Sequence, residues 1–262
     1  MSTTRATTGN VLVTGASSGI GAALARLLAE RGATVGIVAR RRDRLAEVLD
    51  DCRKSSPDSR MWVTDLGDLA DAERVADEAW EAFGHLDTIV NNAAIPKRRH
   101  VIRLTADEVA DVMRINFESP VRMILRLLPR MLERNEGTIV NVASAAGRLG
   151  VLHEAAYCAS KFALSGWTEV MAIDLARTGL RVKLVHPGPI DTEIWSLPDN
   201  EDPIYDGPKV SPEECAAGIL AAMDSESFEH YVPDMKAIVE GKTSAIDDFI
   251  AGSALMEKGM TT

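Results

Sequence analysis

A tyrosine and a lysine four residues apart, Tyr157 and Lys161, are the side chains of this sequence best suited to chemistry. On a helix, that spacing brings two side chains onto one face, so the phenol and the ammonium become neighbours. A lysine charge favours the phenolate, and we therefore expect the pKa of Tyr157 to fall from about 10 toward neutrality. Tyr157 is a candidate acid or base, although such a pair is more often part of an amphipathic helix surface.

Ser144, thirteen residues before Tyr157, gives the pair a chemical context. It ends the run 137–144, an apolar stretch of β type that begins at Gly137 and is followed by Ala145-Ala146-Gly147. Ligands of open parallel sheets bind outside the carboxyl ends of the strands, so Ser144 and the start of the Tyr157 helix can face one crevice. A serine, a tyrosine and a lysine that converge there suit proton transfer to a carbonyl or alcohol oxygen.

These residues and their spacing resemble the active site of the short-chain dehydrogenase/reductase family, which has a serine at a strand end and Tyr-x-x-x-Lys on the next helix. The resemblance implies that Ser144 orients and polarises the substrate oxygen, that Tyr157 gives or takes its proton, and that Lys161 lowers the pKa of Tyr157 and holds the nicotinamide ribose. It also implies a fourth catalytic residue, Asn116, which matches the asparagine thought to hold a water between the lysine and solvent. Outside the family, an asparagine within a helix is usually a surface residue or a helix contact.

A glycine-rich loop follows the first apolar strand, Val11 to Thr14, and leads into a helical run over 22–31. Glycines allow a sharp turn and close approach of a ligand, while free amides at a helix start attract phosphate. The spacing Gly-x-x-x-Gly-x-Gly departs from the common dinucleotide pattern Gly-x-Gly-x-x-Gly. It matches the family's Thr-Gly-x-x-x-Gly-x-Gly over Thr14 to Gly21.

The end of the second strand, over 34–39, predicts which dinucleotide is bound. An acidic residue at this position holds the ribose 2′-hydroxyl of NAD, whereas an arginine accommodates the 2′-phosphate of NADP. Here Ala39 stands in place of the acid and Arg40 follows it, within a cluster of four arginines whose other members we expect to be solvated. The cofactor is therefore predicted to be NADP(H), with NAD(H) as the less favoured alternative.

The resemblance extends the cofactor site to three later strand ends. The family places an aspartate at the adenine after the strand 61–66, Asn-Asn-Ala-Gly after the strand 86–90, and Pro-Gly with a downstream threonine after the strand 181–186. This chain has Asp65, the segment 91–94 with Ala94 in place of the glycine, and the segment 187–192. Asn91 is expected near the adenosine ribose and the central strand. The predicted cofactor-binding residues are Gly15, Ser17, Ser18, Gly19, Ile20, Gly21, Arg40, Asp65, Leu66, Asn92, Ala93, Tyr157, Lys161, Pro187, Gly188, Ile190 and Thr192.

The composition of the chain indicates which partners and which cellular compartment to expect. The formal net charge of −10 argues against nucleic acid or an anionic membrane as the main partner, since both favour basic surfaces. Three cysteines without a Cys-x-x-Cys pair fit a reducing compartment and imply no zinc site. Because the start lacks an apolar signal core and no stretch approaches the roughly 18 apolar residues of a membrane span, we expect a cytoplasmic protein without a metal.

The resemblance implies one doubly wound α/β Rossmann-type domain over residues 1–262, with a parallel sheet of order 3-2-1-4-5-6-7 and helices on both faces. We expect a core over 9–190, a mobile substrate lid over 193–212, a seventh edge strand over 228–233 and a variable tail over 233–262. A capping box at 105–108 predicts one helix that reaches residue 134. This helix and the apolar helix that carries Tyr157 predict a homodimer or homotetramer, because one sheet face cannot cover both.

The expected function is hydride transfer between NADP(H) and a small carbonyl or secondary alcohol. One alternative is an NAD-dependent alcohol dehydrogenase that works mainly in the oxidative direction, since the same residues catalyse both directions. Another is a cofactor-sensing protein without activity, which would be expected to lack one of Ser144, Tyr157 or Lys161. The basic loop 97–100 should lie near the mouth of the crevice, where it is either a solvated loop or a site for an anionic substrate.

Overall fold

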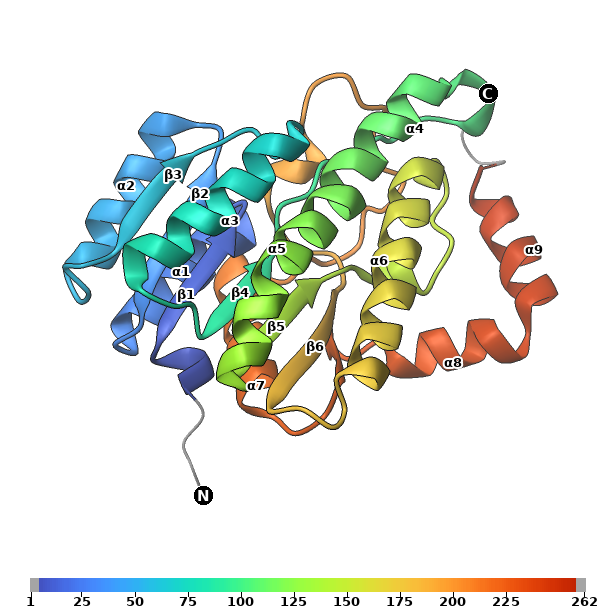
Figure 1. The fold of residues 1–262 in the computed structure, drawn as a ribbon. Helices are drawn as coiled ribbons and strands as arrows, with labels where there is room; N and C mark the ends of the chain where they lie inside the picture. Colours follow the sequence, from blue (N-terminus) through green and yellow to red (C-terminus); the bar gives the residue numbers. More distant parts are fainter. Residues whose placement is uncertain (1–4, 258–262) are drawn as a thin grey trace.

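The protein, seen in a computed structural model that describes residues 5–257, is built on a seven-stranded sheet within that part of the chain. The strand order is β3-β2-β1-β4-β5-β6-β7, and every neighbouring pair is parallel, which confirms the expected topology (Figure 1). The strands are β1 (Asn10–Thr14), β2 (Thr34–Ala39), β3 (Arg60–Val63), β4 (Thr88–Asn91), β5 (Gly137–Val142), β6 (Leu180–Pro187) and β7 (Glu229–Val232).

Helices cover both faces of the sheet. One face packs against α1 (Gly19–Glu30), α2 (Arg42–Arg53) and α7 (Pro212–Asp224), and the other against α3 (Leu69–Phe83), α5 (Ser119–Arg134) and α6 (Ala155–Asp174), with α4 (Ala106–Met113) beside α6. β1 shows how the sequence divides between these layers, because Val11 and Val13 belong to the first core and Leu12 to the second. Strands buried on both faces are apolar throughout, as the runs in the sequence are.

The helix expected over 105–134 is interrupted. The capping box forms, since the Thr105 side chain accepts from the amide of Glu108 and the Glu108 carboxylate accepts from the amide of Thr105. The helix α4 then passes into a π-helical turn, η3 (Arg114–Glu118), before α5 begins. A single π turn inserts an extra residue and commonly marks a functional position. Here it contains Asn116.

Short 3₁₀ turns and a C-terminal arm complete the described chain. The turns are η1 (Arg5–Thr7), η2 (Val101–Arg103), η4 (Ala145–Gly147) and η5 (Glu193–Trp195). The expected third strand is shorter than predicted, because β3 ends at Val63 and leaves Asp65 in the loop that follows. After the edge strand β7, the helices α8 (Lys236–Ser244) and α9 (Ile246–Glu257) extend away from the sheet (Figure 1). Within residues 5–257, no helix combines the length and the apolar character needed to cross a membrane.

Candidate active site

Ser144, Tyr157 and Lys161 converge at the carboxyl end of β5. Ser144 precedes η4, and its hydroxyl accepts a hydrogen bond of 3.1 Å from the amide of Ala146. Tyr157 lies in the first turn of α6 and makes a side-chain hydrogen bond with Ser144. Lys161, one turn later, has its Nζ 5.7 Å from the centre of the Tyr157 ring. All three line the same cavity, so the interpretation of the sequence as a serine, tyrosine and lysine facing one crevice agrees with the structure.

Burial changes the pKa values of this pair in a way that the sequence did not predict. Desolvation raises the pKa of Tyr157, the nearby Glu154 carboxylate raises it further, and the hydrogen bond with Ser144 opposes this. Burial also lowers the pKa of Lys161 to about 7. The Lys161 ammonium donates to the carbonyl of Val142 over 2.9 Å. The desolvation of both groups therefore outweighs the expected lowering of the Tyr157 pKa.

Two sets of contacts hold Ser144 and α6 from behind. The buried His186 of β6 places its Nδ1 2.8 Å from the carbonyl of Ser144 and its Nε2 2.9 Å from the carboxylate of Glu229. On the other side, the Asn116 amide donates to the Ile95 carbonyl over 2.9 Å and to Ser160 Oγ over 3.0 Å, and it accepts from the Ile95 amide. Asn116 is thus placed behind the cavity wall, where it joins the π turn to α6 and to the loop after β4.

The glycine loop forms a close cradle between β1 and α1. Gly15 and Gly19 have φ values of +68° and +53°, in the region that favours glycine. A Cβ on Gly19 would lie 2.9 Å from the methyl carbon of Thr192, and one on Gly21 would lie 2.4 Å from the carbonyl oxygen of Gly15. The helix α1 begins with no side-chain cap on its first amides. Its free N–H groups and the glycine turn therefore fit a phosphate.

Two adjacent arginines after β2, Arg40 and Arg41, make different contacts. Arg40 is exposed, lines the cavity and lies 3.8 Å from the carboxylate of Asp65. Arg41 instead turns toward the glycine loop, where its Nη2 lies 3.0 Å from Ser17 Oγ and 2.7 Å from Ser18 Oγ. Arg41 is exposed, as expected of a solvated arginine, but it also bonds to the glycine loop, which was not predicted.

Glu193, the first residue of η5, connects the predicted lid to the glycine loop and to the arginines after β2. Its carboxylate accepts a hydrogen bond of 2.7 Å from Ser18, is ion-paired with Arg41, and lies 2.5 Å from Arg44 Nη1. The hydrogen bond with Arg41, together with those from Ser18 and Arg44, lowers the pKa of Glu193 to about 2. The start of the lid is therefore fastened to both the glycine loop and α2 by a carboxylate that is ionised at neutral pH.

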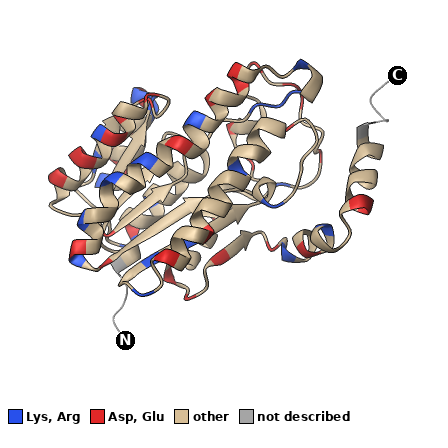
Figure 2. Cartoon of the chain, turned by 45° about the vertical axis from the view of Figure 1, so that its right-hand side comes forward, with Lys and Arg blue, Asp and Glu red and all other residues tan. Residues whose placement is uncertain are grey.

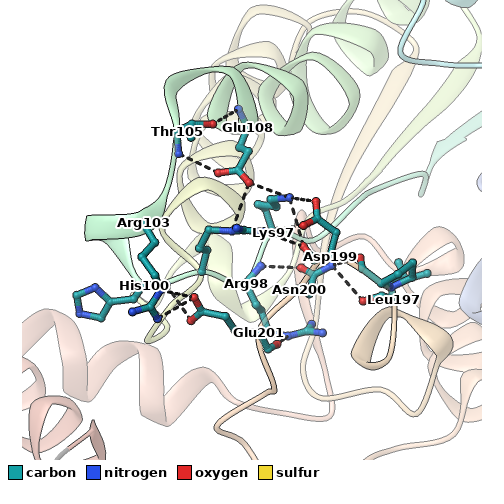
Figure 3. A network of polar contacts seen from close by, with 12 residues as sticks. Lys97, Arg98, His100, Arg103, Thr105, Glu108, Leu197, Asp199, Asn200 and Glu201 are labelled. Carbon is teal, nitrogen blue, oxygen red and sulfur yellow. Dashed lines mark hydrogen bonds and ion pairs between the residues drawn. The ribbon is translucent and has the colours of Figure 1, made fainter.

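The basic loop 97–100 fastens the rest of the lid (Figure 3). Lys97 lies 2.5 Å from the carboxylate of Asp199 and 3.0 Å from that of Glu108. The buried Arg98 donates to three main-chain carbonyls of the lid, those of Ile194, Trp195 and Glu201. The loop is therefore not a solvated one, because Lys97 and Arg99 pair with the lid and with α4, while Arg98 lines the cavity.

A cavity of about 780 Å³ joins these parts. Most of the predicted cofactor and catalytic residues line it: Gly15, Ser18, Gly19, Ile20, Arg40, Asp65, Leu66, Asn92, Ala93, Ser144, Tyr157, Lys161, Pro187, Gly188, Ile190 and Thr192. Three predicted residues do not line the cavity and lie behind residues that do, namely Ser17, Gly21 and Asn116. Asn91 is buried and donates to the side chain of Asn141 over 2.9 Å, so it ties β4 to β5 and does not face the cavity.

Sequence reasoning missed several residues of the site. Glu154, Arg98 and Glu193 line the cavity, as do Phe249 and Met256 of the C-terminal arm. Arg98 and Glu193 lie in the loop 97–100 and the segment 193–212, which were expected beside the crevice without a role for these two side chains, whereas Phe249 and Met256 lie in the tail, to which no role was assigned. Glu154 offered the one local hint, since it stands three residues before Tyr157.

The residues present fit a nicotinamide dinucleotide. The glycine cradle and the uncapped start of α1 suit a pyrophosphate, while Lys161 and Tyr157 lie at the other end of the cavity beside Ser144. The arrangement can give a proton to, or take one from, an oxygen atom bound next to Ser144 and Tyr157.

Comparisons with known proteins agree with this geometry. The family model described as short chain dehydrogenase matches residues 9–202. An uncharacterized oxidoreductase of Bacillus subtilis (strain 168), YxnA, is 34% identical over 230 residues, which are 85% of this chain and 64% of that protein, so the chain spans less than two thirds of that relative.

Solved structures show the same fold with cofactors bound. A short-chain dehydrogenase/reductase from Burkholderia phymatum in complex with NAD aligns with a TM-score of 0.83 at 27% identity, covering 92% of this chain and 95% of that one. A short-chain dehydrogenase from Sphingobium yanoikuyae in complex with NADPH aligns with a TM-score of 0.80 at 26% identity, covering 95% of each chain. The chain belongs to the short-chain dehydrogenase/reductase family and is an oxidoreductase of that family.

Proposed function

We propose that the protein is an NADP(H)-dependent oxidoreductase that transfers a hydride between the nicotinamide and a small carbonyl compound or secondary alcohol. The observation that carries the proposal is the convergence of Ser144, Tyr157 and Lys161 on a cavity whose other end is the glycine cradle. An enzyme that moves only protons would need the three converging side chains but would not need the glycine cradle. Both features together support redox chemistry at a carbonyl carbon.

In the direction of reduction, the Tyr157 hydroxyl donates its proton to the substrate oxygen, and the Ser144 hydroxyl donates a hydrogen bond to the same oxygen. The bound nicotinamide supplies the hydride, or accepts it in the reverse direction. The phenolate that remains on Tyr157 is stabilised by the charged form of Lys161, whose Nζ lies over the ring. Oxidation of an alcohol uses the same residues with each proton moved the other way.

Asn116 completes the proposed proton path. Its contacts with Ile95 and Ser160 fix the π turn beside α6, close to the helix that carries Tyr157 and Lys161. In the proposed mechanism this turn holds a water through which Lys161 exchanges protons with solvent. The position of Asn116 behind the cavity wall supports a role in positioning that water rather than in binding substrate.

The preference for NADP(H) is proposed from the charges at the adenosine end. Ala39 leaves no acid to bind a ribose 2′-hydroxyl, and Arg40 lines the cavity with an exposed guanidinium. Arg41 and Ser17 add a second group of donors beside it. The remaining proposed contacts are those of the glycine loop with the pyrophosphate, Asp65 and Leu66 with the adenine, Lys161 with the nicotinamide ribose, and the segment 187–192 with the nicotinamide.

A panel of aldehydes, ketones and secondary alcohols, assayed by cofactor absorbance with NADPH, NADH, NADP and NAD, tests the proposal. We expect carbonyl-dependent oxidation of NADPH and the reverse reaction with at least one alcohol. Efficient turnover with NAD and alcohols alone would favour the oxidative alternative. Cofactor binding without turnover of any compound would favour a sensor.

We further propose that the protein assembles as a homodimer or homotetramer. Large apolar side chains are exposed on the outer faces of α5 and α6, namely Leu125, Leu132, Phe162, Val170 and Ile173. Elsewhere the charged residues of both signs are spread over the helices (Figure 2). A two-fold contact between these helices would bury the exposed groups.

A further inference from the structure

Glu154 is a buried carboxyl group in the wall of the active-site cavity, three residues before Tyr157. Only 9% of the residue is exposed. It occupies the N-cap position of α6, yet its side chain makes no capping hydrogen bond. The carboxyl is therefore not used to start the helix, and the catalytic roles described above do not use it either.

The Glu154 carboxyl has a charge nearby, but one of its oxygens has no hydrogen-bond donor within residues 5–257. Among the described residues no donor reaches Oε2, which is shielded from solvent. Oε1 lies 3.8 Å from Arg98 Nη1, which is too long for a hydrogen bond. Arg98 directs its N–H groups to the lid carbonyls of Ile194, Trp195 and Glu201 instead. The guanidinium therefore offers Glu154 electrostatic attraction alone.

A buried carboxyl oxygen without a hydrogen-bond donor is unfavourable unless a ligand supplies the donor. Burial raises the pKa of Glu154 to about 7, and the positive charge of Arg98 opposes that rise. A buried acceptor without a donor costs about 1–3 kcal/mol, and native proteins rarely leave one unpaired. Since Glu154 lines a ligand cavity beside Tyr157, the missing donor can arrive with the ligand.

We propose that Glu154 is a substrate-recognition residue, which accepts a hydrogen bond from a hydroxyl or amine group that the substrate carries close to its reactive carbonyl. The inference rests on the proposed function, because Tyr157 must hold the reacting oxygen. Glu154 and Tyr157 are separated by about one helical turn, over which side chains lie about 5–6 Å apart. This spacing fits a donor on the first or second carbon beside the carbonyl. The substrate class is therefore hydroxy or amino ketones and the corresponding diols or amino alcohols.

The competing explanation is that Glu154 serves only as the counter-charge of Arg98 and so supports the lid. The two explanations differ in what they predict for a matched pair of ligands. A substrate-recognition residue distinguishes a ligand that has a donor from an isosteric ligand without one. A counter-charge affects both ligands equally.

The experiment uses 2-hydroxyacetophenone and propiophenone, in which a hydroxyl group is replaced by a methyl group of similar size. The ratio of their dissociation constants is measured by calorimetry on the full chain saturated with NADP, and the ratio of their kcat/KM values with NADPH. Parent, Glu154→Gln and Glu154→Leu are compared, so that the intrinsic reactivity of each ketone cancels. Thermal unfolding and the NADPH dissociation constant of each variant report on folding.

We expect the parent to prefer the hydroxy ketone, and Glu154→Leu to reduce this preference by about 10- to 150-fold, the range of a hydrogen bond to a charged group. Glu154→Gln keeps an acceptor oxygen of the same size, so its preference should fall only severalfold. If Glu154→Leu does not fold, the Gln variant decides alone. A parent that does not prefer the hydroxy ketone, or a preference that neither variant changes, contradicts the inference whether or not either ketone is reduced. Failure of the proposed function itself is seen separately, as a lack of NADPH oxidation across the whole carbonyl panel.

Discussion

Arg40 and Arg41 are adjacent, but their surroundings give them different parts in cofactor binding. Arg40 is exposed at the cavity and has a single distant partner, Asp65, at 3.8 Å. An exposed ion pair of that length contributes little, so the Arg40 guanidinium is free to meet a 2′-phosphate. Arg41 is already bound to Ser17, Ser18 and Glu193 and must exchange partners to reach a ligand. Arg40 is therefore the better target for changing cofactor choice.

Cofactor choice should follow from this contact. A charge-assisted hydrogen bond contributes about 1.5–3 kcal/mol, so the parent is expected to favour NADPH over NADH by about 10- to 150-fold in kcat/KM. The double variant Ala39→Asp/Arg40→Leu supplies a partner for ribose hydroxyls, repels the phosphate and should reverse the preference. Arg42→Leu, at a neighbouring exposed arginine, is the control and should leave the ratio unchanged. Equal efficiency of the parent with both cofactors would mean that Arg40 points to solvent.

Glu154 should make the stability of the protein depend on pH. Its pKa rises from 4.5 to about 7 on folding, so between those pH values the folded state binds more protons than the unfolded state. Stability from this group is therefore lost as the pH rises through that window, on the order of 3 kcal/mol by pH 8. Glu154→Gln removes the effect, and its melting temperature relative to the parent should be several degrees higher at pH 8 than at pH 5. A pH-independent difference would refute the raised pKa.

At the scale of elements, the lid is fastened at its start by Glu193 and further along by the loop 97–100 (Figure 3). Glu193 binds Ser18 and Arg41, which also flank the site proposed for the cofactor phosphates. A carboxylate and a phosphate compete for the same donors. The lid and an anionic cofactor are therefore coupled through these two residues.

Removal of the Glu193 charge should free Arg41 for the cofactor. We expect Glu193→Gln to bind NADPH severalfold more tightly than the parent, with a smaller change for NADH, as measured by calorimetry. Asp199→Asn is the matched control, since it removes a lid carboxylate whose partners, Lys97 and Arg99, lie away from the glycine loop. Weaker NADPH binding in Glu193→Gln would show that this carboxylate orders the loop for the cofactor and does not compete with it.

The elements that the sequence predicted well are those determined by local pattern. The apolar runs predicted the strands, and the resemblance to the family predicted their order in the sheet. The π turn at Asn116 was not predicted, and the side chain of Asn116 bonds to Ile95, 21 residues away in the chain. The expectation of a solvated loop at Lys97 was wrong, because Lys97 pairs with Asp199, 102 residues away. Charge along the sequence carries no record of such pairs.

The pKa of Tyr157 was predicted in the wrong direction for a different physical reason. The sequence supplies the neighbouring Lys161, whose charge lowers a phenol pKa, but it does not supply the degree of burial. In the structure both groups are buried, and desolvation penalises the phenolate and the ammonium alike. The Tyr-x-x-x-Lys pair alone therefore does not determine the pKa of Tyr157.

At the scale of the whole molecule, α5 and α6 leave apolar side chains uncovered. Val170 and Ile173 on α6 are 56% and 68% exposed. We expect light scattering at micromolar concentration to give at least the mass of a dimer, and Val170→Glu/Ile173→Glu to give a monomer, because two buried charges would oppose the contact. Ile102→Glu, which changes an even more exposed apolar residue in η2, should leave the assembly unchanged. A monomeric parent would rule out the proposed assembly.

The central claim is that Tyr157 transfers the proton at a carbonyl reduced by NADPH. The most direct test is the pair of parent and Tyr157→Phe, a change that removes only one hydroxyl group, measured with a carbonyl substrate from the panel. The variant should bind NADPH with the affinity of the parent to within a few fold, while its kcat falls by at least 10²-fold, as is typical for the loss of a general acid. A kcat within tenfold of the parent would contradict the assignment of Tyr157 and with it the proposed mechanism.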